Sequence, residues 1–277
     1  MTEKNSILCP NCRRLISRDE PVCPYCLTDR PGARWKRGIL GGFSLFQADP
    51  VRAIIAVNAA FYLFSLLLNP AGLGLSANPM HFLSPSGESL FLLGATGTLP
   101  IAAYGRWWTL ITASFLHGGI LHIFFNMMAL RQLAPFVIEE FGLHRFTILY
   151  VWTGAAGFLL SYVAGIPFTM GASASVCRLI GAILFYGKSR GGHYGEAIYR
   201  QAMGWVVGLA LFGLFFPGIN NWAHGGGLLS GIGIAFIAGY RERTPEAFGH
   251  RILGTATLWI AAAALLWSLI QAVYLLF

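Results

Sequence analysis

The sequence predicts an all-α polytopic membrane protein with a small cysteine-rich unit ahead of its first span. Of its 277 residues, 56% are hydrophobic and only 11% are charged, whereas soluble domains carry about a quarter charged residues. The mean hydropathy is +0.61. The first 50 residues hold many of the charges, and long later stretches hold none. A surface that is mostly exposed to water is therefore excluded.

Seven segments are candidates for spanning helices, because about 20 mostly apolar residues cross a bilayer. Several of them contain small residues at short spacing, such as Gly154 and Gly157, which let helices approach closely in lipid. The predicted spans are 51–69, 119–138, 146–166, 172–187, 201–218, 221–240 and 253–277. The expected organisation is a cysteine-rich unit at 1–30, a basic linker at 31–50 and a membrane domain at 51–277.

The distribution of basic residues predicts the orientation, because cytoplasmic loops carry an excess of Lys and Arg. Of 19 such residues, nine precede Ala53 and seven more fall in alternate later loops. With the N-terminus inside, all sixteen are cytoplasmic, and only Arg106 lies in an outer loop. We therefore expect a cytoplasmic N-terminus and an outer C-terminus, in a bacterial cell (inner) membrane. The net charge of +8 then reflects topology, and no nucleic-acid partner is expected.

The long connection between the first two spans, residues 70–118, is rich in Gly, Pro and aromatic residues. It is too polar and broken to span, yet Phe91-Leu92-Leu93 and Trp107-Trp108 are too apolar to float free. We expect a loop partly immersed at the outer face, with its tryptophans at headgroup depth. A plain linker is the alternative.

Two Cys-Pro-x-Cys pairs precede the first span and supply four thiolates, enough to close a tetrahedral zinc site. They are Cys9, Cys12, Cys23 and Cys26. Cytosolic thiols stay reduced, which favours metal over disulfides. The pattern resembles the short zinc ribbons at the ends of many bacterial membrane proteins. Four sulfur ligands leave no open position, so the zinc is expected to be structural and the unit to be a structural or docking module for a cytoplasmic partner. Cys177, alone in a span, takes no part.

Polar residues inside spans are costly and point to function. Three clusters of them lie near the starts of the second, fourth and sixth predicted spans. They are His117 to Asn126 with His122 between, Gly171 to Ser175, and Ala223 to Gly227 with His224 as its polar member.

These three spans all descend from the outer face, so the clusters lie at similar depth and can form one pocket. Ser173 would be the nucleophile and His224 its base, with His122 and Asn126 donating hydrogen bonds to an oxyanion. His122 and Asn126 are four residues apart and project from one helix face. Each part also has a structural explanation, since a span serine commonly packs helices and His122 and Asn126 could bridge them.

The set resembles the rhomboid family of intramembrane serine proteases. The resemblance rests on His117-x4-His122-x3-Asn126, Gly171-x-Ser173 and Ala223-His224, and it covers about residues 51–275. It implies a six-helix core with a seventh C-terminal span appended. It also implies a catalytic dyad of Ser173 and His224 that needs no cofactor. In the family, oxyanion donors correspond to the Ser173 amide, His122 and Asn126, and His117 shapes the outer loop.

Three residues depart from the family pattern. Ala174 stands where a glycine commonly follows the serine, and Cys177 stands where an aromatic residue often supports the histidine ring. Arg178 stands where the family has a small residue, about 7.5 Å deeper along the helix than Ser173. A charge there costs at least ~3 kcal/mol unless it is paired or hydrated. With no acid nearby in a span, Arg178 is expected either to bond backbone carbonyls or water, or to wedge against a neighbouring helix, and the wedge is preferred.

Two functions follow from these observations. The first is an endopeptidase that cuts single-span membrane proteins near the outer face of the bilayer. The second is an inactive rhomboid-like protein that binds membrane clients, which Arg178 favours and the intact Ser173 and His224 oppose. A transporter is unfavoured, because no charged path runs through the spans.

Overall fold

The computed structural model describes residues 6–9, 12, 14–26, 31–32, 49–75, 82–216 and 218–276. The chain divides into two compact units, Met1–Ala53 and Ile54–Phe277. The predicted basic linker at 31–50 lies outside the described residues except for 31–32 and 49–50.

The N-terminal unit is a small hairpin with a core of cysteines. Strands β1 (Ser6–Leu8) and β2 (Leu15–Ser17) pair antiparallel, with Ile7 opposite Ile16. The N–H of Cys9 donates to the Arg14 carbonyl at 2.9 Å and closes the turn side of the hairpin. Ile16, Cys9 and Cys23 are buried. A core of so few buried side chains provides little stability for an independent unit. Domains of this size commonly need a metal or a disulfide to fold.

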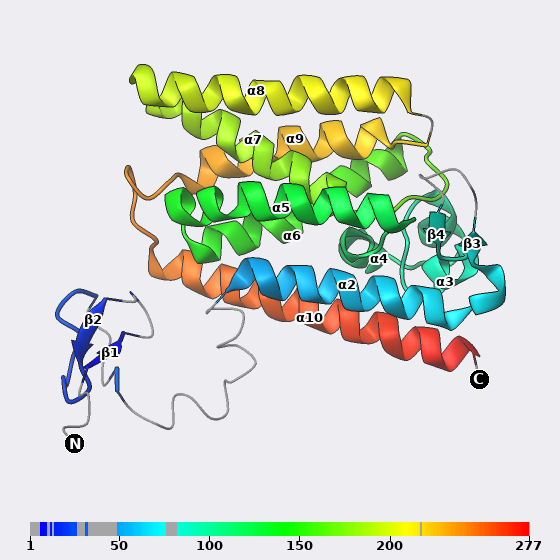
Figure 1. Ribbon diagram of the computed structural model, residues 1–277, viewed down its shortest axis with the longest axis horizontal. Coiled ribbons are helices and arrows are strands. Elements are labelled where there is room, and N and C mark those ends of the chain that lie inside the picture. Colours follow the sequence, from blue (N-terminus) through cyan, green and yellow to red (C-terminus); the bar gives the residue numbers. More distant parts are fainter. Residues whose placement is uncertain are drawn as a thin grey trace. The chain divides into compact units, whose positions relative to one another are not determined.

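The larger unit is all-helical apart from one short strand pair, which confirms the predicted class. Seven described helices have 18 residues or more and run roughly side by side (Figure 1). They are α2 (Pro50–Leu68), α5 (Ile120–Phe141), α6 (Leu143–Val163), α7 (Ser173–Arg190), α8 (Gly192–Phe215), α9 (Asn221–Ala238) and α10 (Phe248–Leu276).

Each predicted span is helical, and its boundaries lie within three residues of the prediction except at two helix starts. Helix α8 begins nine residues before the predicted 201, and α10 begins five residues before 253. The added turns carry Glu196, Arg200 and Arg251, so the helices continue into polar sequence that hydropathy alone assigns to loops. Between α5 and α6 the chain turns within a single residue, because Gly142 adopts φ +99°.

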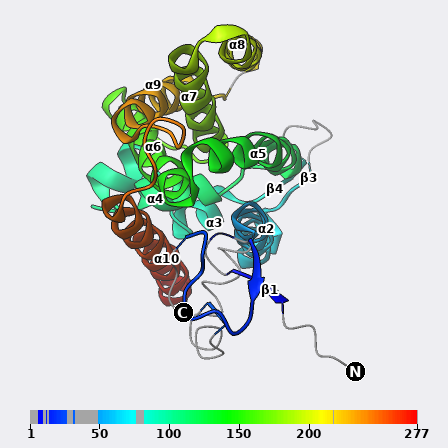
Figure 2. The ribbon, with the colours of Figure 1, turned by 90° about the vertical axis from the view of Figure 1, so that its left-hand side faces the viewer.

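Five of the described helices, α2, α5, α6, α8 and α10, are long and apolar enough to cross a membrane by length and composition. The other two, α7 and α9, have 18 residues each and carry the polar candidates Ser173, Arg178 and His224. Most of α7 is buried among other helices. It packs against α9, α8, α6 and α5, and Figure 2 shows α7 enclosed in this group. A helix covered by protein needs less apolar surface than one facing lipid.

Glycines bring α6, α7 and α9 into close contact. A Cβ added at Gly157 of α6 would lie 2.7 Å from the Ala223 carbonyl oxygen, and one at Gly227 would lie 2.7 Å from that of Ala174. No larger side chain fits at either place without moving a backbone. This close packing fixes the relative positions of the first turns of α7 and α9.

The connection before α5 is a folded element and not a plain linker. It contains η2 (Pro70–Gly72), β3 (Gly74–Leu75), β4 (Phe82–Ser84), α3 (Gly87–Leu92), η4 (Leu99–Ala103), α4 (Thr109–Thr112) and η5 (Ala113–Phe115).

Four consecutive carbonyls at the end of α3 are held by side chains from three places in the chain. Arg106 donates to the first two, those of Phe91 and Leu92, at 2.6 and 3.0 Å. Ser268 of α10 donates to the third, Leu93, at 2.6 Å, and Thr112 donates to the fourth, Gly94, at 2.9 Å. Burial lowers the pKa of the Arg106 guanidinium. The only predicted outer-loop cation therefore anchors this loop, and the seventh long helix is tied to it.

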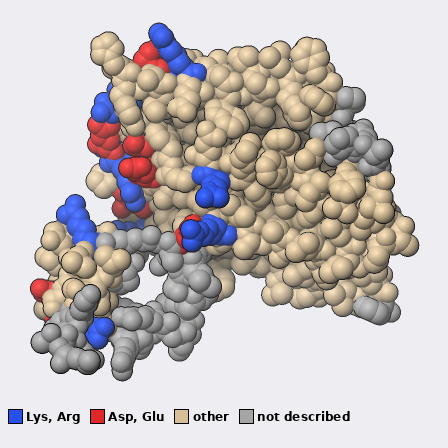
Figure 3. Space-filling view, viewed as in Figure 1, with Lys and Arg blue, Asp and Glu red and all other residues tan. Residues whose placement is uncertain are grey.

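Charged side chains gather at one end of the helices, where α5 meets α6, α7 meets α8, and α9 meets α10 (Figure 3). Arg190 and Glu242 form an ion pair of 2.6 Å across two of these turns. Glu246 accepts hydrogen bonds from the N–H groups of His144 and Arg145 at 2.9 and 3.1 Å. A carboxylate at a helix N-terminus is favourable because it satisfies free donors and the helix dipole.

Candidate active site

The three polar clusters meet in the structure, at the opposite end of the helices from the charged turns. Ser173 is the first residue of α7 and His224 is the fourth of α9. The Nε2 atom of His224 lies 2.9 Å from the Ser173 hydroxyl oxygen. This is hydrogen-bond distance between a potential base and a potential nucleophile.

A side-chain cap fixes the start of α9, the helix that carries His224. Asn220 precedes α9, and its side-chain oxygen accepts from the Ala223 N–H at 3.1 Å. Its amide nitrogen donates to the hydroxyls of Ser161 and Thr169 at 2.6 and 2.9 Å. Asn220 thus joins the start of α9 to the end of α6 and to the segment that leads to Ser173. The sequence interpretation missed it, although asparagine just before a helix is a typical N-cap signal.

Gly171 supplies the room and the backbone turn ahead of Ser173. Its φ is +134°, and a Cβ there would lie 2.7 Å from His122 Nε2 and 3.4 Å from the Ser173 hydroxyl. Its N–H donates to the Ala113 carbonyl at 2.8 Å. Only glycine fits here, which explains the motif Gly171-x-Ser173 in physical terms.

The ring of His122 faces the serine with a defined tautomer. Its Nδ1 accepts a hydrogen bond from the Gly118 N–H at 3.3 Å. In a neutral ring the proton is then on Nε2, the atom that faces Gly171, so His122 presents an N–H donor to the site.

His117 and Asn126 complete the cluster. His117 is fully buried and packs edge-on against the His122 ring, with centroids 5.1 Å apart. Asn126 lies one turn below His122 and is 6% exposed. Its Nδ2 has no hydrogen-bond partner among the described residues. A buried free donor is costly in a finished structure and is available to a bound group.

The N-terminus of α7 adds backbone donors. The Val176 N–H makes a helix bond to the Ala172 carbonyl at 2.9 Å. The N–H groups of the residues before it lie in the unpaired first turn, at the positive end of the helix dipole. Nδ1 of His224 has no hydrogen-bond partner among the described residues, so none of them serves as an acidic third member of the pair.

Arg178 shows the first of its two expected behaviours, bonding to carbonyls. Its side chain is fully buried. Its Nε donates to the Ala174 carbonyl at 2.9 Å, and its Nη1 donates to the Tyr150 carbonyl of α6. The sequence-based preference for a wedge did not consider these acceptors, because hydropathy does not show which backbone carbonyls a neighbouring helix presents.

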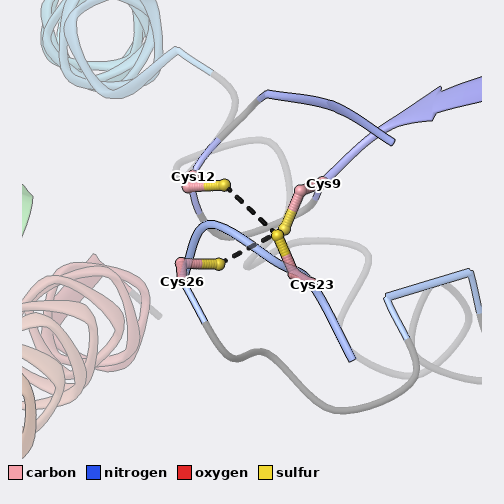
Figure 4. A group of neighbouring side chains, drawn as sticks. All are labelled: Cys9, Cys12, Cys23 and Cys26. Carbon is pink, nitrogen blue, oxygen red and sulfur yellow. Dashed lines mark hydrogen bonds between the residues drawn. The ribbon is translucent and has the colours of Figure 1, made fainter. Parts of the chain in front are cut away.

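The four N-terminal cysteines form a second candidate site. Figure 4 shows the four side chains converging, with Cys9 directly after β1 and Cys26 in the turn at 24–26. All four sulfurs lie within 4.8 Å of one another, and the pairs Cys9–Cys26 and Cys12–Cys23 are each 3.6 Å apart. A tetrahedral zinc with Zn–S bonds of about 2.3 Å requires sulfurs about 3.8 Å apart. The arrangement fits one metal ion.

The helical fold is that of a polytopic membrane protein, and it brings a serine and a histidine together at the start of α7. Residues 104–241 match the family described as Rhomboid domain. The chain belongs to the rhomboid family and is an integral membrane protein.

Among curated relatives, it is similar to "Rhomboid protease GluP" of Bacillus subtilis (strain 168), at 32% identity over 65% of this chain and 35% of that protein. It is also similar to "RHOMBOID-like protein 6, mitochondrial" of Arabidopsis thaliana, at 31% identity over 64% of this chain and 60% of the relative. "Inactive RHOMBOID-like protein 8" of Arabidopsis thaliana is 30% identical over 56% of this chain and 44% of that protein. The matches span about a third to three fifths of these relatives' lengths. The family therefore holds both proteases and inactive members.

Proposed function

We propose that this chain is an intramembrane serine endopeptidase that cleaves single-span membrane proteins through a dyad of Ser173 and His224. One observation supports this above the others: the 2.9 Å contact between Ser173 Oγ and His224 Nε2. A serine that only packs helices needs no base at hydrogen-bond distance.

The proposed chemistry follows the geometry of the site. His224 Nε2 takes the hydroxyl proton as Ser173 Oγ attacks the scissile carbonyl, and then returns it to the leaving amine. A water activated by the same His224 nitrogen then hydrolyses the acyl-enzyme. The carbonyl oxygen becomes negative during attack, and the Ser173 N–H, His122 Nε2–H and Asn126 Nδ2 donate to it. His117 and Gly171 support the site by holding and making room for His122.

The second candidate function is binding of membrane clients without cleavage. Two observations favour it: Arg178 lies five residues after the serine, and one relative carries the word inactive in its name. Labelling with a fluorophosphonate probe distinguishes the two functions. The protease predicts one covalent adduct, located on Ser173, whereas a client-binding protein predicts none.

Replacing Asn126 by alanine should slow cleavage by about 10²–10³-fold without abolishing it, because one oxyanion donor is worth that much. The rate constant for cleavage of a single-span substrate measures this effect. Met127→Ala is the matched control on the next position of α5 and should keep the wild-type rate. A full wild-type rate in Asn126→Ala would remove Asn126 from the mechanism.

The proposed setting is a bacterial cell membrane, with the N-terminal unit in the cytoplasm and the active site near the outer face. The substrates reach the site from the bilayer, and no nucleic acid takes part. The gathering of Lys and Arg in the turns opposite the site supports this orientation.

A topology reporter fused ahead of Met1 should therefore read cytoplasmic, and one fused after Phe277 should read outside. The reason is that seven spans, an odd number, place the two ends of the chain on opposite sides of the membrane. Both reporters reading the same side would mean an even number and would contradict the orientation.

The four cysteines are proposed to bind one structural zinc ion, with residues 1–30 as the zinc unit, 31–50 as a linker and 51–277 as the membrane domain. Four thiolates occupy every position of a tetrahedral ion and leave none for a substrate. The zinc stabilises the small hairpin, which then can dock a cytoplasmic partner.

A further inference from the structure

Arg178 lies where three helices meet. Its backbone packs against α9, since a Cβ added at Gly231 would meet the backbone atoms of Arg178. Its side chain points instead to α6, where a Cβ added at Gly154 would meet both terminal nitrogens of the guanidinium. The guanidinium therefore fills a notch that Gly154 leaves in α6.

Without an acid nearby, this notch provides hydrogen-bond acceptors for two of the three guanidinium nitrogens, and Nη2 has none among the described residues. Nε bonds the Ala174 carbonyl of α7, and Nη1 bonds the Tyr150 carbonyl of α6. The guanidinium carbon also lies 5.8 Å from the centre of the Tyr150 ring. A planar guanidinium can bond two carbonyls and contact an aromatic face at once, which a lysine ammonium cannot match. Hydrogen bonds from a charged donor are stronger than neutral ones.

One of these bonds reaches the carbonyl of Ala174, the residue next to the nucleophile. Ala174 follows Ser173, and its carbonyl oxygen abuts Gly227, three residues after His224 in α9. The side chain of Arg178 thus connects three parts of the scaffold: the first turn of α7, the contact of that turn with α9, and the wall of α6.

We infer that Arg178 is a positioning residue that ties the first turn of α7 to α6 and so holds Ser173 at its distance from His224. This inference rests on the proposed protease function. It assigns a constructive role to the residue that the sequence pattern marks as foreign to an active rhomboid site.

The contact of the Arg178 side chain with α6 at Gly154 can be tested without any activity, by a double-mutant cycle on thermal stability. Gly154→Ala should lower the melting temperature, because its methyl group displaces the guanidinium. In an Arg178→Ala background the same change should cost little, since the notch is then empty. The matched control is Gly233→Ala in α9, where an added Cβ meets nothing within 4 Å. Its effect should be the same in both backgrounds. Equal effects of Gly154→Ala in both backgrounds would contradict the contact between Arg178 and α6.

The positioning role needs a kinetic readout. Active sites of each variant are first counted by end-point fluorophosphonate labelling, and cleavage is measured well below the melting temperature. Arg178→Ala should lower kcat per labelled site by about 10²-fold with KM unchanged, because a displacement of about 1 Å at a reacting group has such an effect. Arg178→Lys, which can reach one carbonyl but not both, should recover part of kcat.

The outcomes distinguish failure of the positioning role of Arg178 from failure of the protease function. A kcat per site that stays equal or rises in Arg178→Ala would overturn the positioning role and favour a wedge. If wild-type protein takes no probe, the protease function fails and the positioning role fails with it. In that case the stability cycle still reports whether the contact between Arg178 and Gly154 exists.

Discussion

Replacing His224 by alanine should reduce the cleavage rate about as much as replacing Ser173, and the double replacement should cost no more than either alone. In a serine hydrolase the nucleophile and base act as one unit, and loss of either costs about 10⁶-fold in kcat. The reason here is the 2.9 Å contact, since Ser173 has one base and His224 has one proton to take. The measurement is kcat for wild type, both single variants and the double variant, with folding checked by thermal melting.

Ser175→Ala is the control for this series. Ser175 lies two residues further along α7, is fully buried, and is not bonded to His224. It should keep wild-type cleavage within a small factor. Strictly additive losses in the Ser173 and His224 double variant would mean that the two residues act independently, which contradicts a dyad.

Substituting Cys9 and Cys12 together by serine should reduce the zinc content from about one ion per chain to none. Binding of structural zinc to small cysteine domains is worth roughly 10–16 kcal/mol, and such domains are unfolded without it. The hairpin of β1 and β2 has a core of only a few buried side chains, two of which are the ligands Cys9 and Cys23. Metal analysis of the purified protein gives the stoichiometry, and protease sensitivity reports whether the N-terminal unit is still folded.

Cys177→Ser serves as the matched control, because Cys177 is a buried cysteine of α7 outside the cluster. Its zinc content should equal that of wild type. The melting temperature of the membrane unit should be nearly unchanged in the Cys9 and Cys12 double variant, since its helices pack around separate cores. Zinc that persists after both cysteines are lost would contradict the four-thiolate site.

Much of the fold could be predicted from the sequence, because membrane spans depend on local hydropathy and length. The same holds for the site, since Ser173, His224 and His122 each lie near the start of a predicted span, and the three spans are predicted to run in the same direction. Depth along a helix is fixed by counting residues at 1.5 Å each, so their convergence could be expected without knowing any contact.

Contacts between helices could not be predicted in this way. Asn220 joins Ser161 and Thr169 over more than fifty residues of sequence, and Arg178 bonds Tyr150 across 28. Each depends on the rotation of one helix against another, which hydropathy does not determine. Helices α7 and α9 also fall short of the apolarity of a typical span. For α7 the reason is that other helices cover most of its surface, which lipid would otherwise contact.

The proposed role of Ser173 as the nucleophile of a protease working within the bilayer can be measured in liposomes. The protein is reconstituted with a single-span substrate, and wild type is compared with Ser173→Ala. Wild type should cleave the substrate near the outer membrane face, and Ser173→Ala, equally folded, should yield no product. Cleavage at the wild-type rate by Ser173→Ala would contradict the mechanism altogether.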